Sequence, residues 1–242
     1  MTDLRGKTAI ITGGGSGIGE GVAMALARHG MNVVICGRRE AALARVVGAI
    51  AAEGGAALPV AADVSQEADA ARVAAAAVDT YGAVHLLVNN AAIYGGGPIH
   101  AHDVAEWDRV MAVNLRGPFL MARAVLPLMR QQGEGHIINI SSESGVEYYE
   151  GDGAYGVSKH ALNALSEIIQ RENQAHNIRV NAVCPGMVVT EMTQDSVGLN
   201  RERCLYPEDI ADLVLWLATR RANVKIGRPL LIQTMLNPWE AS

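Results

Sequence analysis

The 242-residue sequence has no long hydrophobic segment, no run of basic residues and only three cysteines. Its apolar stretches are short or interrupted, so we expect no transmembrane helix and no association with a membrane. The net charge is −5, and without a positively charged stripe nucleic-acid binding is not expected. Cys36, Cys184 and Cys204 lie far apart without the spacing of a metal site, so we expect reduced, buried thiols and no bound metal.

The first residues, MTDLRGKTAIITGGG, lack a signal-peptide pattern and lead directly into an apolar, strand-like run. Together with the odd number of cysteines, this predicts a cytoplasmic protein. Half of the residues are apolar and 19% are charged, as in globular rather than disordered chains. No linker, repeat or change of composition divides residues 1–242, so we expect a single domain.

Apolar, strand-like runs alternate with segments of helical periodicity along the whole chain. The predicted strands cover residues 8–12, 32–36, 57–64, 84–92, 136–142, 178–186 and 229–235. The predicted helices cover residues 18–29, 40–53, 66–81, 103–131, 155–176 and 207–219. Such alternation predicts an α/β fold with helices on both faces of a parallel sheet. Right-handed crossovers then give a Rossmann-type, doubly wound sheet of about seven strands.

Glycines are concentrated between the first predicted strand and the first predicted helix, in the sequence TGGGSGIG (12–19). Gly13, Gly17 and Gly19 do not follow the GxGxxG spacing of the usual dinucleotide motif, so the glycines alone could mark a merely structural turn. This turn is nevertheless the place where open α/β sheets bind dinucleotides, because the helix N-terminus there favours phosphate.

The residues after the second predicted strand bear on the choice of dinucleotide. NAD favours an acidic side chain there for its ribose 2′-hydroxyl, whereas NADP favours arginine for its 2′-phosphate. The sequence has Arg38 and Arg39 and no carboxylate, which favours NADP(H) over NAD(H), unless both arginines are simply solvated at a helix start. Asp63, followed by Val64, is placed either to meet an adenine amino group or to cap a helix.

A tyrosine and a lysine stand four residues apart at the start of the predicted helix 155–176. Tyr155 and Lys159 therefore share one helix face, and an ammonium group near a phenol favours the phenolate. Such a tyrosine suits proton transfer to or from a carbonyl or alcohol oxygen, although many helices contain this pair without any such function. Ser142 lies at the carboxyl end of a predicted strand, where its hydroxyl could bind a substrate oxygen.

In their order and spacing, these motifs resemble those of the short-chain dehydrogenase/reductase family in its single-domain form. The resemblance extends over almost the whole chain and implies hydride transfer with a nicotinamide cofactor. It rests on TGGGSGIG at 12–19, DV at 63–64, NNAA at 89–92, VNL at 113–115, NISS at 139–142, YGVSK at 155–159 and PGMVVTEM at 185–192.

The resemblance also implies roles for individual residues. Tyr155 would be the general acid/base, and Lys159 would lower its pKa and hold the nicotinamide ribose. Ser142 would orient the substrate oxygen, and Asn114 would sustain a water relay from Lys159 to solvent. Besides Tyr155 and Lys159, the implied cofactor-binding residues are Gly13, Ser16, Gly17, Ile18, Gly19, Arg38, Arg39, Asp63, Val64, Asn90, Ala91, Pro185, Gly186, Val188 and Thr190.

The loop between Ser142 and Tyr155 is expected to border the substrate. Its sequence, ESGVEYYEGDG (143–153), contains acidic residues and no basic one. Charge of one sign biases which ligands enter a cleft, so neutral or amine-bearing carbonyl compounds should be favoured over free carboxylates, unless these acids face water. The candidate substrate contacts are Tyr94, Ser144, Tyr148, Tyr149 and Met187.

Two segments depart from the family pattern. Only sixteen residues, 191–206, separate Thr190 from Pro207, which predicts a short substrate lid. The chain ends in PLLIQTMLNPWEAS, without the acidic-glycine-glycine tail of many family members. The oligomer geometry is therefore open, and we expect a homodimer or homotetramer that associates through the wide apolar faces of helices 103–131 and 155–176.

The leading functional hypothesis is an NADP(H)-dependent oxidoreductase that interconverts a small-molecule carbonyl and a secondary alcohol. Reduction of an imine or a C=C bond on the same scaffold is an alternative. A regulator that binds NADP(H) without turnover is another, but it has no chemical need for the complete set of Asn114, Ser142, Tyr155 and Lys159.

Overall fold

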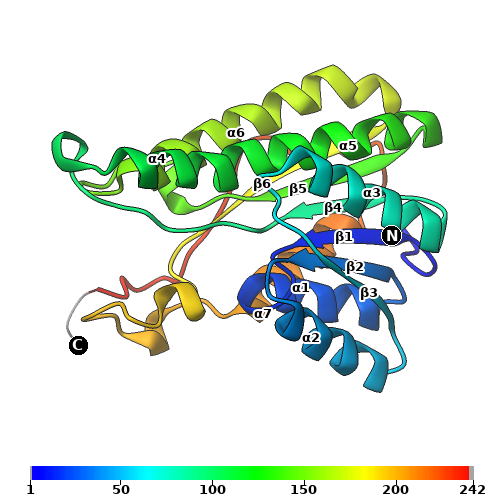
Figure 1. Ribbon diagram of the computed structural model, residues 1–242, viewed down its shortest axis with the longest axis horizontal. Helices are drawn as coiled ribbons and strands as arrows, with labels where there is room; N and C mark the ends of the chain where they lie inside the picture. Colours follow the sequence, from blue (N-terminus) through cyan, green and yellow to red (C-terminus); the bar gives the residue numbers. More distant parts are fainter. Residues whose placement is uncertain (1, 240–242) are drawn as a thin grey trace.

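The computed structural model describes residues 2–239, in which seven parallel strands form one sheet (Figure 1). The strand order is β3-β2-β1-β4-β5-β6-β7. This confirms the predicted doubly wound sheet, and most predicted strand boundaries agree within a few residues. The strands are β1 (Thr8–Thr12), β2 (Asn32–Gly37), β3 (Ala56–Ala61), β4 (Leu86–Asn89), β5 (Gly135–Ile140), β6 (Ile178–Pro185) and β7 (Leu230–Ile232).

Helices cover both faces of this sheet (Figure 1). One layer contains α1 (Gly17–Arg28), α2 (Glu40–Ala52) and α7 (Pro207–Ala218). The other layer contains α3 (Glu67–Tyr81), α4 (Val104–Met111), α5 (Gly117–Gln132) and α6 (Gly153–Asn173). None of the helices in residues 2–239 is long and apolar enough to cross a lipid bilayer.

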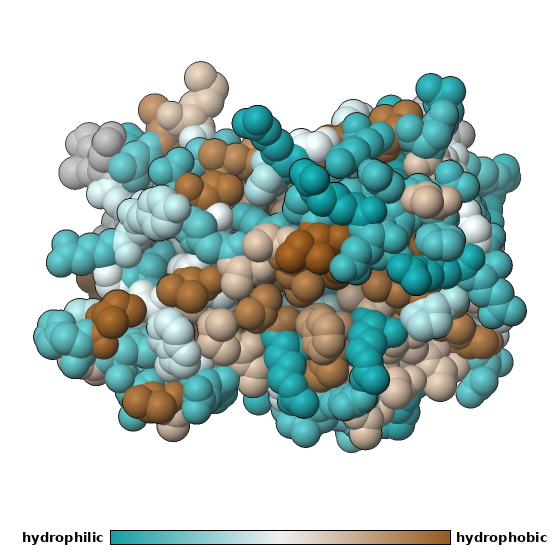
Figure 2. Space-filling model, turned by 90° about the horizontal axis from the view of Figure 1, so that it is seen from above, coloured by the Kyte–Doolittle hydropathy of each residue, from teal (hydrophilic) through white to brown (hydrophobic). Residues whose placement is uncertain are grey.

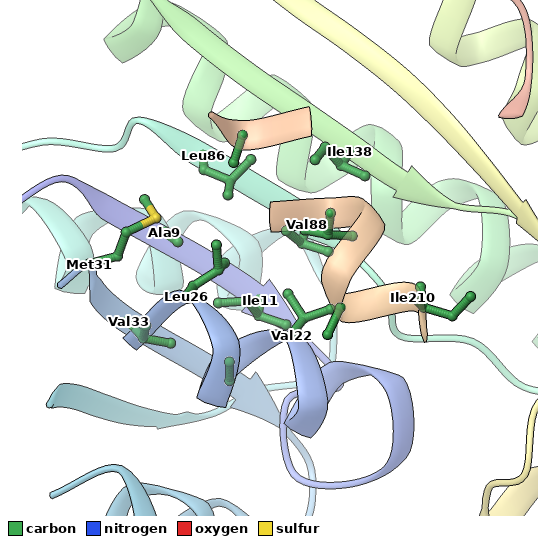
Figure 3. Close-up of a cluster of buried hydrophobic side chains, with 14 of the residues drawn as sticks. Ala9, Ile11, Val22, Leu26, Met31, Val33, Leu86, Val88, Ile138 and Ile210 are labelled. Carbon is green, nitrogen blue, oxygen red and sulfur yellow. The ribbon is translucent and has the colours of Figure 1, made fainter. Parts of the chain in front are cut away.

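Each face of the sheet has its own hydrophobic core, because the central strands are buried on both sides. Figure 3 shows the core beneath α1 and α7, where Ile11 of β1 packs with Val22 and Leu26 of α1. Val22 and Leu26 are one helical turn apart and fully buried, and each burial contributes roughly 1.5–3 kcal/mol. These contacts fix α1 against the carboxyl end of β1.

The sheet changes its direction of winding between β1 and β4. From β1 the chain proceeds outward to β2 and β3, and it then returns to β4 on the other side of β1. The connections that leave the carboxyl ends of β1 and β4 consequently diverge to opposite faces. An open α/β sheet binds its ligands in the crevice that forms at such a point.

The predicted helix 103–131 is interrupted. An α-helix ends at Met111, a wide π-helical turn follows over Ala112–Arg116, and α5 begins at Gly117. Single π-helical turns of this kind occur frequently at functional sites. This one contains the buried Asn114, whose surroundings are described below.

The segment after β6 and the segment after β7 pack against each other. Residues 191–206 contain two short 3₁₀ turns, Glu191–Thr193 and Arg201–Arg203. The Asn200 amide donates to the Pro238 carbonyl, and the Thr234 hydroxyl donates to the carbonyl of Arg203. The last strand is shorter than predicted, because pairing with β6 is limited to Leu230–Ile232.

Candidate active site

A cleft of about 570 Å³ lies at the carboxyl ends of the strands. It joins the glycine turn and the two arginines at one end to the tyrosine–lysine pair at the other. The predicted site residues that line it are Gly13, Ser16, Gly17, Ile18, Arg38, Arg39, Asp63, Val64, Asn90, Ala91, Tyr94, Tyr155, Lys159 and Thr190. Residues from five βα connections are thereby brought into one site.

The glycine turn has a backbone that only glycine adopts readily. Gly13 and Gly17 have φ angles of 66° and 53°, in the left-handed region. A Cβ on Gly19 would lie 2.3 Å from the Gly13 carbonyl oxygen, so a side chain cannot fit there. The turn brings the N-terminus of α1 to the cleft without intervening side chains, and its free N–H groups can hold a phosphate. These residues therefore fit the pyrophosphate of a dinucleotide.

Thr12 fixes the turn to the neighbouring connection, a role that the motif analysis missed. Its hydroxyl oxygen accepts hydrogen bonds from the backbone amides of Asn90 and Ala91, both at 3.0 Å. The side chain of Asn90 donates in return to the carbonyl of Thr12, at 3.0 Å. Asn90 thus positions the wall of the cleft through backbone contacts. A threonine at the last position of an apolar strand was the only available signal.

The two arginines lie at the exposed end of the cleft but have different surroundings. Arg39 forms an ion pair with Glu191 at 2.7 Å and donates to the Ser16 hydroxyl at 2.9 Å. The Arg38 guanidinium makes no hydrogen bond or ion pair with any residue between 2 and 239. Both side chains are exposed, so either can meet an anionic group from solvent.

Asp63 lines the cleft, but it does not cap a helix as the alternative interpretation proposed. The N-terminal cap of α3 is Gln66. One carboxylate oxygen of Asp63 instead accepts from the amide and the hydroxyl of Ser65, at 3.0 and 2.7 Å. This local turn holds Asp63 at the edge of the cleft.

Tyr155 lies in the first turn of α6, with its side chain in the cleft. Burial raises the pKa of the Tyr155 phenol to about 12, and a hydrogen bond with the Ser142 side chain acts in the opposite direction. The free protein therefore holds a neutral phenol at physiological pH, and the net pKa shift is upward rather than downward. The Ser142 hydroxyl oxygen also accepts from the Ser144 amide at 3.2 Å, which fixes its position.

Lys159 is one helical turn further along α6 and only 2% exposed. Its ammonium group donates to the Ile140 carbonyl at 2.9 Å and lies 5.5 Å from the centre of the Tyr155 ring. Burial lowers the pKa of Lys159 to about 8. Since the lysine remains mostly protonated at neutral pH, it supplies a cation next to the phenol.

Asn114 is held by three hydrogen bonds inside the π-helical turn. Its amide group donates to the Ile93 carbonyl and the Ser158 hydroxyl, and its oxygen accepts from the Ile93 amide. No hydrogen bond joins Asn114 to Lys159 directly. Asn114 therefore joins the β4–α4 loop to α6. The water relay from Lys159 to solvent stays a prediction.

The comparison with protein families gives one result for most of the chain. Residues 7–198 match the model for short chain dehydrogenases. The chain belongs to the short-chain dehydrogenase/reductase family. A search of curated proteins finds an uncharacterised oxidoreductase of Staphylococcus aureus that is 33% identical over 94% of this chain and 97% of its own length.

Solved structures of dehydrogenase/reductases have the same fold. A metagenomic short-chain oxidoreductase in complex with NADP is 37% identical, with a TM-score of 0.83, over 98% of this chain and 100% of that chain. A 3-ketoacyl-(acyl-carrier-protein) reductase from Brucella melitensis complexed with NADH is 34% identical, with a TM-score of 0.88, over 95% and 97%. Levodione reductase is 28% identical, with a TM-score of 0.87, over the same shares.

The candidate substrate contacts of this dehydrogenase/reductase do not form a single wall. Tyr94 packs against Tyr155, with ring centres 5.2 Å apart. Tyr148 is 87% exposed and stacks on His160 of α6 instead. Ser144 is buried, while Tyr149 is exposed and Met187 is partly buried. Pro185 is the last residue of β6, Gly186 and Val188 follow it, and none of the three lines the cleft.

Arg109 was missed by the sequence analysis. It lines the cleft and forms an ion pair with Glu106 at 3.5 Å. Its helical position was predicted, but nothing in the local sequence indicated that it would face the cleft. Arg109 therefore adds a further cation to the lining of the cleft, besides Arg38, Arg39 and Lys159. Within residues 2–239, no cluster of three or more potential ligands could hold a metal ion.

Proposed function

We propose that this protein is an NADP(H)-dependent oxidoreductase that interconverts a carbonyl and a secondary alcohol. The observation that carries the proposal is the composition of one cleft, with two arginines at one end and the Tyr155–Lys159 pair at the other. The separation between the arginines and the tyrosine–lysine pair suits a long dinucleotide, whose nicotinamide would donate or accept the hydride when bound. A cofactor sensor has no need for the buried cation next to a phenol.

Tyr155 is the proposed proton donor and acceptor. Its phenol is neutral in the free protein, so it can donate a proton to a carbonyl oxygen during reduction. Ser142, which hydrogen-bonds to Tyr155, holds the phenol and offers a second hydroxyl to the substrate oxygen. Lys159 then stabilises the phenolate that remains, because its ammonium group lies beside the ring.

The choice of NADP(H) rests on Arg38 and Arg39. Both line the cleft just beyond β2, and β2 itself does not end in the carboxylate that would bind a ribose hydroxyl. Guanidinium groups bind phosphate with charge-assisted hydrogen bonds, and within residues 2–239 Arg38 has no competing partner. The related metagenomic oxidoreductase was solved with NADP, whereas the Brucella reductase was solved with NADH, so structures of relatives contain either cofactor.

Neutral or amine-bearing carbonyl compounds are the proposed substrates. Glu147 and Glu150 are exposed on the loop after Ser142, and Glu143 accepts a hydrogen bond from Gln233 at 2.5 Å. Asp152 keeps one buried oxygen without a partner among the described residues. Arg109 lines the cleft but is paired with Glu106, while the loop carboxylates lie outside the cleft lining and would act on ligands only at a distance. A higher kcat/KM with simple keto acids than with amino ketones would contradict this preference.

The decisive experiment follows oxidation of NADPH and NADH with a panel of ketones, aldehydes and diketones. Tyr155→Phe should lower kcat at least about a hundredfold, as expected for loss of a general acid. NADPH affinity, measured separately by fluorescence, should change little in the same variant. Turnover by Tyr155→Phe at the wild-type rate would exclude the proposed role. Tight NADPH binding without turnover of any substrate would favour the sensor.

A homodimer or homotetramer in the cytoplasm is the proposed working form. Figure 2 shows the face formed by α4, α5 and α6, where apolar side chains are exposed among polar ones. Phe119 on α5 and Val157 and Ile168 on α6 are each about half exposed. Such residues favour burial against a second copy. A monomer mass in light scattering at micromolar concentration would contradict this proposal.

A further inference from the structure

Three connections meet at the mouth of the cleft through a single carboxylate. Glu191 follows Thr190 after β6, Arg39 follows β2, and Ser16 lies in the glycine turn after β1. One oxygen of Glu191 accepts from Arg39 at 2.7 Å and from the Ser16 hydroxyl at 3.3 Å. Arg39 also donates to Ser16 at 2.9 Å, which closes a triangle of three side chains.

This carboxylate makes the contacts that an incoming phosphate would make. Arg39 and Ser16 are both among the residues predicted to bind the cofactor, and a phosphate oxygen would accept hydrogen bonds from the same donors. The Arg39 hydrogen bond holds the pKa of Glu191 below its usual value, so the carboxylate is charged at neutral pH. A phosphate and this carboxylate therefore cannot share Arg39 without repulsion.

Arg38, unlike Arg39, is not paired with Glu191. It lies next to Arg39 at the cleft and has no partner among the described residues. A 2′-phosphate can reach Arg38 without displacing any group, whereas contact with Arg39 requires Glu191 to leave. The two adjacent arginines are therefore not equivalent as binding groups.

We propose that Glu191 sets cofactor selectivity by competing with the 2′-phosphate of NADP(H) for Arg39. The competition weakens NADP(H) binding and leaves NAD(H), which lacks this phosphate, almost unaffected. The inference rests on the proposed binding of a nicotinamide dinucleotide in this cleft. It makes Glu191 a selectivity determinant of the binding site and gives it no part in proton transfer.

The test is a comparison of dissociation constants for NADPH and NADH by fluorescence or calorimetry in wild type and Glu191→Gln. The substitution keeps the size of the side chain and removes its charge. NADPH should bind about three- to fivefold more tightly, as for loss of an exposed ion pair, and the NADH constant should change less than about twofold. The ligands 2′,5′-ADP and 5′-AMP should show the same difference without the nicotinamide.

A matched control is the exposed ion pair between Arg28 and Glu53, whose atoms approach to 2.7 Å at the C-terminal ends of α1 and α2. Glu53→Gln changes the net charge equally and should leave both cofactor constants unchanged. In an Arg39→Gln background, Glu191→Gln should lose its effect, because the contested group is gone. Equal tightening of NADPH and NADH, weaker NADPH binding, or a full effect without Arg39 would each overturn the inference.

The proposed function has a separate test in the same assay. Arg38→Gln combined with Arg39→Gln should weaken NADPH far more than NADH. If this double variant retains the wild-type ratio of constants, the proposed NADP(H) specificity fails, together with the inference that rests on it. If the double variant behaves as expected but Glu191→Gln does not, only the inference about Glu191 fails.

Discussion

The imidazole of His136 on β5 is hydrogen-bonded to the side-chain oxygen of Asn181 on β6, at 2.9 Å. Both residues are buried. The Asn181 amide nitrogen donates to the Ile226 carbonyl, so its oxygen is the atom that faces His136 and the ring nitrogen is the donor. Burial, together with the nearby Arg179, lowers the pKa of His136 to about 3, and the ring remains neutral.

We expect this pair to make the protein acid-sensitive. An unfolded histidine binds a proton near pH 6.5, whereas His136 in the folded protein does not until about pH 3. The contribution of His136 to stability is therefore fully present above pH 6.5 and is lost as pH decreases toward 3. The loss from this residue between pH 7 and 5 is about 2 kcal/mol. The free energy of unfolding, measured with urea at pH 7 and pH 5, should fall by about 2 kcal/mol more in wild type than in His136→Gln. An equal fall in both proteins would contradict the prediction.

Lys159→Met should stabilise the protein while it abolishes activity. Burial lowers the lysine pKa from 10.5 to about 8. The cost of burying the charge therefore destabilises the folded state fully below pH 8 and disappears as pH rises toward 10.5. Removal of the charge should raise the free energy of unfolding at pH 7 by about 2 kcal/mol. This figure already subtracts about 1 kcal/mol for the lost hydrogen bond to the Ile140 carbonyl. Chemical denaturation measures this gain. Lys7→Met is the control, since Lys7 pairs with Glu134 at the surface and its loss should not stabilise.

Gly19→Ala and Gly48→Ala should have opposite effects on stability. A Cβ at position 19 would lie 2.3 Å from the Gly13 carbonyl oxygen, and we expect a loss of about 3 kcal/mol from the forced displacement. Gly48 lies inside α2 with no atom within 4 Å of an added Cβ, so alanine there should gain about 0.5–1 kcal/mol. Thermal and urea unfolding of both variants would decide, and a stable Gly19→Ala protein would refute the close approach.

Thr12→Val should destabilise the glycine turn although the two side chains have nearly the same shape. The change removes the acceptor for the Asn90 and Ala91 amides, and we expect a loss of about 2–3 kcal/mol. Thr12→Ser keeps the hydroxyl and loses one methyl group, so its loss should be about 1 kcal/mol. If Ser and Val variants prove equally stable in urea, the hydroxyl is not the group that fixes the turn.

Local patterns were sufficient for the fold because a parallel sheet buries whole strands. The five apolar or small residues of β1 are all buried, and the predicted boundaries Thr8–Thr12 match the observed strand. The glycines also indicated the ligand-binding turn, because only glycine readily adopts its left-handed backbone conformation. The Tyr155–Lys159 pair could be found because its spacing equals one helical turn.

Contacts between distant segments could not be predicted in this way. Glu191 reaches Arg39 across the cleft, and no periodicity relates residues that are so far apart in sequence. Arg109 lines the cleft because of how α4 packs against distant segments, which the periodicity of its own sequence does not show. The pKa of Tyr155 likewise depends on burial, which the sequence pattern of α6 does not show.

The π-helical turn at Ala112–Arg116 has a consequence for how this chain can change in length. A wide turn accommodates one residue more than a regular α-helix would. Deletion of one residue there would restore a regular helix in which α4 and α5 keep their present faces. The same deletion inside α5 would instead rotate every later side chain by about 100°, and apolar residues packed against α3 would turn toward solvent. We infer that the chain can lose one residue at this turn without moving these helix faces, provided that Asn114 and its three hydrogen bonds are kept.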